Sequence, residues 1–150
     1  MTRDQDTLRM LAEVEAANAD LARRAKAPLW YHPALGLLVG ALIAVQGQPT
    51  SILLVFYAAY IAGLALLVRA YKRHTGLWVS GYRAGRTRWV ALGLATLTMI
   101  GGVIAVWLLR ERGLTAAPLI FGAIVAVIVT VGGFVWEAAF RADLRDGRPL

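Results

Sequence analysis

The sequence predicts an all-α integral membrane protein: a four-transmembrane-helix bundle preceded by an N-terminal cytoplasmic amphipathic helix. Three observations support this fold class. Hydrophobic residues make up 59% of the 150 residues, above the roughly 45–50% of soluble domains. They gather into long runs, and a chain this short cannot cover apolar runs of about 18 residues in water. Lys and Arg lie almost entirely on one side of these runs.

Residues 1–28 form the predicted cytoplasmic N-terminal helix. Ala, Leu, Glu and Arg dominate residues 4–26, and no Gly or Pro interrupts them before Pro28, which favours a helix. An apolar stripe recurs at helical spacing: Met10, Val14, Ala17 and Leu21. Two interpretations remain open. The stripe is either a short coiled coil or partner-docking helix, or the face of an exposed helix that lies on the membrane or on the basic loop described below.

Residues 29–140 form the predicted transmembrane domain, with spans at about 29–47, 51–68, 89–109 and 116–140. Trp30 and Tyr31 stand at the start of the first span, as interfacial aromatic residues do. The apolar part of that span, Ala34–Val45, is short by itself, and we expect neighbouring spans to help hold it in the membrane. Pro118 occupies a tolerated first-turn position of the fourth span. A charged tail, residues 141–150, ends the chain.

The distribution of Lys and Arg predicts the orientation of the spans. Five of these residues lie in the N-terminal segment, six in residues 69–88 and three in the tail, whereas only Arg110 and Arg112 lie on the opposite side. Cytoplasmic loops carry the excess of Lys and Arg. We therefore expect both termini and the central loop in the cytoplasm. The small size and the Arg- and Ala-rich composition suggest a bacterial plasma membrane (the bacterial inner membrane), with the chain as a multi-pass protein.

The basic central loop, residues 69–88, is the main candidate binding site. Its cations stand close to the predicted membrane surface, where each Lys or Arg contributes about 1 kcal/mol of attraction to anionic lipid. Three glycines, Gly76, Gly81 and Gly85, interrupt any long helix there. The interpretations are a topology signal with nonspecific lipid attraction, or a specific site for a lipid headgroup, phosphate or protein. The candidate residues are Arg69, Lys72, Arg73, Trp78, Tyr82, Arg83, Arg86 and Arg88.

A second candidate site is a pathway inside the membrane. Glu137 is the one ionisable residue within an apolar span, and membrane carboxylates often mark ion or proton routes. Tyr57 and Tyr60 lie three residues apart on one helical face of the second span. However, Arg141 follows Glu137 at helical i, i+4 spacing, so an interfacial ion pair explains the carboxylate without transport.

Two further patterns concern packing. Small residues recur at four-residue spacing, as in Gly36–Gly40–Ala44, Ala59–Gly63 and Gly122–Ala126, which predicts close helix contacts within one bundle or across a homodimer. The tetrapeptide ALGL occurs at 34–37 and again at 91–94. That repetition is either a duplicated helical hairpin or a chance match between sequences of narrow composition.

The chain lacks the patterns of several function classes. It contains no cysteine, which excludes thiol catalysis and thiolate metal sites. His32 and His74 have no acidic residue near them in the sequence, and no metal-binding, Walker, dinucleotide or G-x-S-x-G pattern is present. We therefore expect that the protein is not an enzyme and that it binds no cofactor and no metal. The basic loop matches no recognised nucleic-acid-binding pattern either.

The sequence thus predicts a non-enzymatic membrane subunit or regulator that engages anionic lipid headgroups or a protein partner through its basic loop. The alternative is a small transporter or channel, which would be a homo-oligomer because four short spans leave little room for a pathway in one copy.

Overall fold

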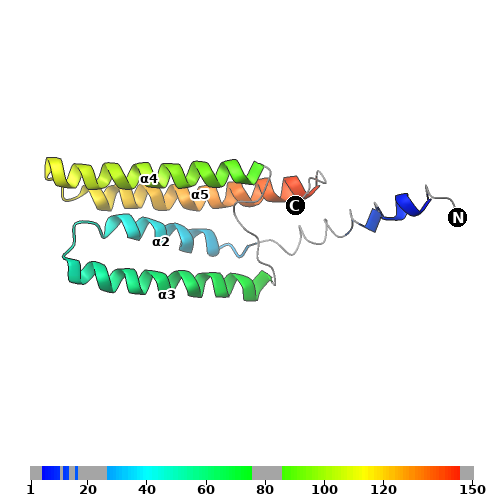
Figure 1. The fold of residues 1–150 in the computed structure, drawn as a ribbon, viewed down its shortest axis with the longest axis horizontal. Coiled ribbons are helices and arrows are strands. Elements are labelled where there is room, and N and C mark those ends of the chain that lie inside the picture. The colour runs from blue at the N-terminus through cyan, green and yellow to red at the C-terminus, as the bar shows by residue number, and fades with distance from the viewer. Residues whose placement is uncertain (1–4, 11, 14–15, 17–26, 76–85, 146–150) are drawn as a thin grey trace.

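The computed structural model describes residues 5–10, 12–13, 16, 27–75 and 86–145 of the chain. Regular secondary structure in these ranges is helical, without strands. Four helices run side by side (Figure 1): α2 (Tyr31–Ala44), α3 (Thr50–Thr75), α4 (Arg86–Arg112) and α5 (Ala117–Arg145). The all-α prediction is therefore confirmed for the described part of the chain.

Three of the helices, α3, α4 and α5, are long and apolar enough to cross a membrane. They contain 26, 27 and 29 residues, or roughly 40 Å each at 1.5 Å per residue, against a hydrocarbon core of about 30 Å. Helix α2 has 14 residues, about 21 Å. It is shorter than the predicted first span, as its short apolar core indicated.

Tight turns join the helices at one end of the bundle. Gly47, between α2 and α3, has a φ of +94°, and Gly113, after α4, has a φ of +64°. Glycine reaches positive φ without the strain that a side chain would add. The start of α2, the end of α3, the start of α4 and the end of α5 all lie at the other end (Figure 1).

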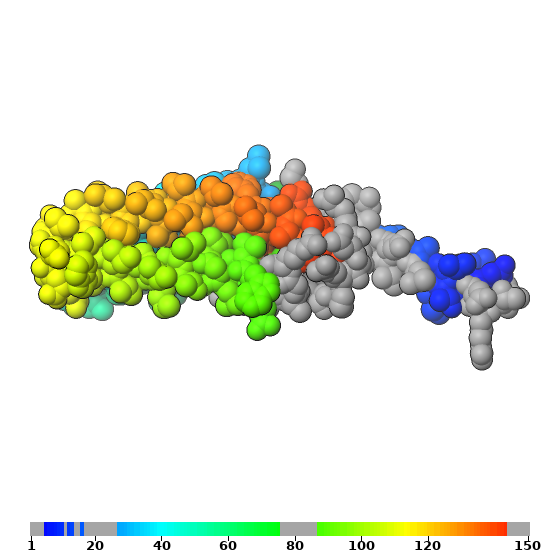
Figure 2. Space-filling view, turned by 90° about the horizontal axis from the view of Figure 1, so that it is seen from above, coloured from blue at the N-terminus to red at the C-terminus, as the bar shows by residue number. Residues whose placement is uncertain are grey.

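Helix α5 is the centre of the packing, because it contacts both α2 and α4 extensively. Figures 1 and 2 show α4 and α5 side by side along their length. The buried core joins these three helices through Ile43, Ala105, Val125 and Val129. By contrast, α3 packs mainly against α2 and has little contact with α4 or α5 in the described part of the chain. Most of its surface is exposed and apolar.

Small residues bring α2 and α5 into close contact. A Cβ atom at Gly36 would collide with the Ala126 carbonyl oxygen and the Thr130 hydroxyl oxygen, and one at Gly40 would collide with the Gly122 carbonyl oxygen. The predicted small-residue ridges of the first and fourth spans therefore face each other within one chain.

Three further predictions can be compared with the structure. Residues 5–10, 12–13 and 16 are helical and exposed, while the remainder of the predicted N-terminal helix lies outside the described residues. The central loop is narrower than predicted, because α3 continues to Thr75 and α4 begins at Arg86; residues 76–85 lie outside the described residues. The packing does not repeat between the hairpins α2–α3 and α4–α5, so the duplication stays a hypothesis.

Candidate functional site

Exposed cations gather where α3 ends and α4 begins. Arg69, Lys72, Arg73 and His74 of α3 are exposed, as is Arg88 of α4. Trp89 beside them is 74% exposed. We call this end of the bundle the basic end. Four predicted site residues, Arg69, Lys72, Arg73 and Arg88, thus lie at the same end of the bundle (Figure 1), on two helices that have little direct contact with each other.

The structure describes little of the other members of the predicted basic site. Trp78, Tyr82 and Arg83 lie outside the described residues, and Arg86 is described only as the first residue of α4.

A buried polar pair lies at the same end of the bundle. His32 Nε2 in the first turn of α2 is 2.9 Å from Glu137 Oε2 near the end of α5. Both side chains are almost fully buried, at 6% and 7% exposure. Arg141 Nη2 lies 3.7 Å from the other carboxylate oxygen of Glu137. The expected Glu137–Arg141 proximity is present, and Glu137 also gives His32 an acidic neighbour that lies 105 positions away in the chain.

The backbone of α5 leaves room for this pair. A Cβ atom at Gly133, one turn before Glu137, would collide with the His32 imidazole. One turn earlier, the Thr130 hydroxyl donates to the Ala126 carbonyl at 2.7 Å and lies 3.5 Å from the His32 carbonyl oxygen. Glycine and threonine on one face of α5 therefore bring the start of α2 close enough for His32 to reach Glu137.

Aromatic rings enclose the buried pair. The Phe134 ring centroid lies 4.7 Å from that of His32, in an edge-on arrangement. The Tyr31 ring packs against the His32 ring at 5.4 Å and against the Tyr71 ring of α3 at 4.8 Å. Because Tyr71 follows Arg69 by two residues, the pair lies level with the first cations of the basic end.

The predicted pathway residues do not form one cluster. Gln46, just after α2, donates to the Tyr57 hydroxyl at 3.2 Å and to the Leu42 carbonyl at 2.9 Å. Tyr60 is partly buried and stacks against Phe56 at 6.2 Å. These contacts lie near the end of α2 and the start of α3, whereas Glu137 pairs with the start of α2.

The described site combines exposed cations at one end of the bundle with a buried polar pair between α2 and α5. Within the described ranges, no three His, Asp or Glu side chains come together as metal ligands. The His32–Glu137 pair was the feature that sequence reasoning missed, because the two residues are 105 positions apart and share no motif. No family model, curated protein or solved structure matches this chain.

Proposed function

We propose that the chain is a non-enzymatic membrane subunit or regulator that binds anionic lipid headgroups through its basic end. In this proposal all four helices span a bacterial inner membrane, with both termini and the basic end in the cytoplasm. The short helix α2 is held in the bilayer by its close contact with α5.

One observation carries the proposal: exposed cations and an exposed tryptophan lie together at one end of apolar helices. Arg69 and Arg73 come from α3 and Arg88 from α4, so two separate helices present charge at the same end of the bundle (Figure 1). Trp89 and Trp107 on α4 are both exposed. They are about 27 Å apart along the helix, close to the hydrocarbon thickness of about 30 Å. Tryptophan prefers the two membrane interfaces, which supports placing the cations at headgroup level.

Lipid retention tests the proposal. The full chain is purified in a mild detergent, stripped of lipid and titrated with dioleoyl phosphatidylglycerol, and bound lipid is counted by native mass spectrometry. We expect stepwise loss of bound lipid as Arg88, Arg73 and Arg69 are replaced in turn by Ala, because each cation contributes about 1 kcal/mol. Arg112→Ala is the control, since it removes one exposed arginine from the opposite end.

Two results would end the proposal. One is a triple variant that binds phosphatidylglycerol as tightly as the unchanged chain. The other is an equal loss of binding in Arg112→Ala, which would make net charge rather than the basic end responsible. A protein that copurifies with the unchanged chain but not with the triple variant would show that the basic end binds a protein partner.

The second candidate function is transport by a homo-oligomer, and the buried His32–Glu137 pair is the observation that favours it. Ionisable groups inside membrane proteins commonly serve proton or ion movement. The test is proton flux in liposomes that contain Glu137→Gln. The exposed carboxylate Glu111, replaced by Gln, is the control. Undiminished flux in Glu137→Gln, or no flux in the unchanged chain, would remove this candidate.

A further inference from the structure

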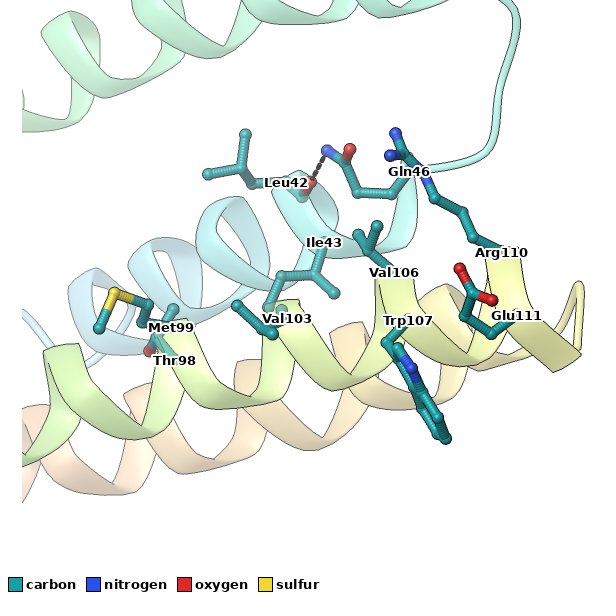
Figure 3. Close-up of a pocket in the computed structure, with 11 residues that line it drawn as sticks. Leu42, Ile43, Gln46, Thr98, Met99, Val103, Val106, Trp107, Arg110 and Glu111 are labelled. Atoms are coloured by element: carbon teal, nitrogen blue, oxygen red, sulfur yellow. Dashed lines mark hydrogen bonds between the residues drawn. The ribbon is translucent and has the colours of Figure 1, made fainter.

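A groove opens between α2 and α4 at the end opposite the basic end (Figure 3). It has a volume of about 610 Å³, within the range of about 300–1,000 Å³ typical of small-molecule sites. The groove exists because α3 packs on α2 without closing against α4. It is separate from the His32–Glu137 pair and from every cation of the basic end.

The lining of the groove changes in polarity along its length. Ile43, Gly102 and Val103 make an apolar middle. At the end near the turns, Gln46, Arg110 and Glu111 form a polar mouth. Figure 3 shows Arg110 extending from α4 toward Gln46 at the end of α2, with the Glu111 carboxylate beside it on α4.

The length of the groove matches one leaflet of a bilayer. Its lining on α4 runs from Thr98 to Glu111, about 20 Å along the helix axis. Half of a hydrocarbon core of about 30 Å is roughly 15 Å. The apolar part therefore extends from the membrane surface to near the midplane, parallel to the helices, as a lipid chain does.

The charges at the mouth define the headgroup. Arg110 and Glu111 are both exposed, and neither forms an ion pair with another residue in the ranges that the structure describes. A guanidinium binds phosphate with charge-assisted hydrogen bonds. A neighbouring carboxylate repels an anionic headgroup but accepts hydrogen bonds from a primary ammonium. The mouth thus complements a headgroup that carries both a phosphate and a primary ammonium.

We infer that the α2–α4 groove binds one phosphatidylethanolamine molecule of the leaflet opposite the basic end. One acyl chain lies along Ile43 and Gly102, the phosphate accepts from Arg110, and the ammonium donates to Glu111. This site goes beyond the proposed function, because its location and its preferred headgroup both differ from those of the basic end.

The test uses the full delipidated chain and three dioleoyl lipids that differ in headgroup: phosphatidylethanolamine, phosphatidylcholine and phosphatidylglycerol. Binding is followed by native mass spectrometry. Gly102→Leu fills the groove, since a Cβ at Gly102 meets the Ile43 side chain only at an ordinary 3.8 Å. Gly93→Leu is its matched control on the same helix, because a Cβ there meets nothing within 4 Å. Arg110→Ala and Arg112→Ala form a second pair that tests the headgroup.

We expect phosphatidylethanolamine affinity to fall about tenfold or more in Gly102→Leu and in Arg110→Ala, the effect of losing one charge-assisted contact or its equivalent. Gly93→Leu and Arg112→Ala retain the affinity of the unchanged chain. Replacing the basic-end arginines leaves phosphatidylethanolamine binding intact even where phosphatidylglycerol binding is lost, so the two proposals fail separately. Unchanged binding in Gly102→Leu and Arg110→Ala would overturn the site. If the unchanged chain binds phosphatidylcholine as tightly as phosphatidylethanolamine, Glu111 does not select the headgroup by accepting from its ammonium.

Discussion

His32 and Glu137 meet across 105 residues of chain, with Nε2 of the imidazole 2.9 Å from a carboxylate oxygen. The contact joins the first turn of α2 to the last part of α5. Helix α2 is the shortest of the four, and its most extensive contact is with α5. The pair therefore acts as a clamp that holds α2 in the bundle at the end where the cations lie.

The clamp predicts a loss of stability when one member is removed. His32→Ala leaves the buried Glu137 carboxylate with Arg141 at 3.7 Å as its remaining partner. We expect the free energy of unfolding to fall by about 1–3 kcal/mol, measured by denaturant titration in detergent micelles. His74→Ala is the control because His74 is exposed on α3. If the two histidine variants lose equal stability, His32 is not part of a clamp.

The small-residue contact between α2 and α5 predicts opposite signs for two glycine substitutions. Gly40→Ala places a Cβ against the Gly122 carbonyl oxygen, and we expect destabilisation of about 1–3 kcal/mol from overpacking. Gly93→Ala points into open space and removes a glycine from a helix interior, which favours the helix by up to about 1 kcal/mol. The same unfolding titration compares them. Stabilisation by both would mean that helix propensity, rather than the α2–α5 contact, controls the result.

Because α3 lies on the outside of the bundle, we expect truncation of an isoleucine on α3 to cost less stability than the same truncation in the core. Ile43→Ala removes a side chain that is 5% exposed in the α2–α4–α5 core, and we expect a loss of about 2–5 kcal/mol. Ile61→Ala removes one that is 68% exposed on α3 and leaves no cavity, so we expect a change within about 0.5 kcal/mol. A large loss for Ile61→Ala, measured in the same detergent, would show that α3 is buried against another surface.

The proposed orientation predicts opposite labelling of the two ends. Because the chain has no cysteine, single Cys residues at Gln48 and His74 report without background. Both positions are exposed. We expect an impermeant maleimide to label Gln48→Cys in intact cells and His74→Cys only after the cells are opened. The reverse pattern would invert the assignment of the basic end to the cytoplasm.

Much of this architecture can be predicted from the sequence because each apolar helix and its flanking residues form a recognisable local pattern. Long apolar runs, the basic residues that flank them and glycines such as Gly113 are visible along the chain without knowledge of contacts. The small-residue ridges of Gly36–Gly40 and Gly122–Ala126 also identified faces that meet. Their partner could not be assigned from sequence, because such a ridge serves a neighbouring helix or a second copy equally well.

The remaining features depend on how the helices are arranged. His32 precedes an apolar run and Glu137 ends another, and nothing local indicates that α2 and α5 bring them together. Likewise, the groove near Arg110 exists because α3 does not close against α4, which no periodicity in α3 reveals. The apolar composition of α3 is the same for a lipid-facing helix as for a buried one, since lipid tails and core side chains are equally apolar.

Native mass spectrometry of the chain, extracted gently from its own membrane with lipids retained, tests whether the basic end binds anionic lipid. We expect anionic phospholipid to remain bound to the unchanged chain and to be lost from a variant in which Arg69, Arg73 and Arg88 are replaced by Ala. Equal retention of anionic phospholipid by the variant and the unchanged chain would contradict it.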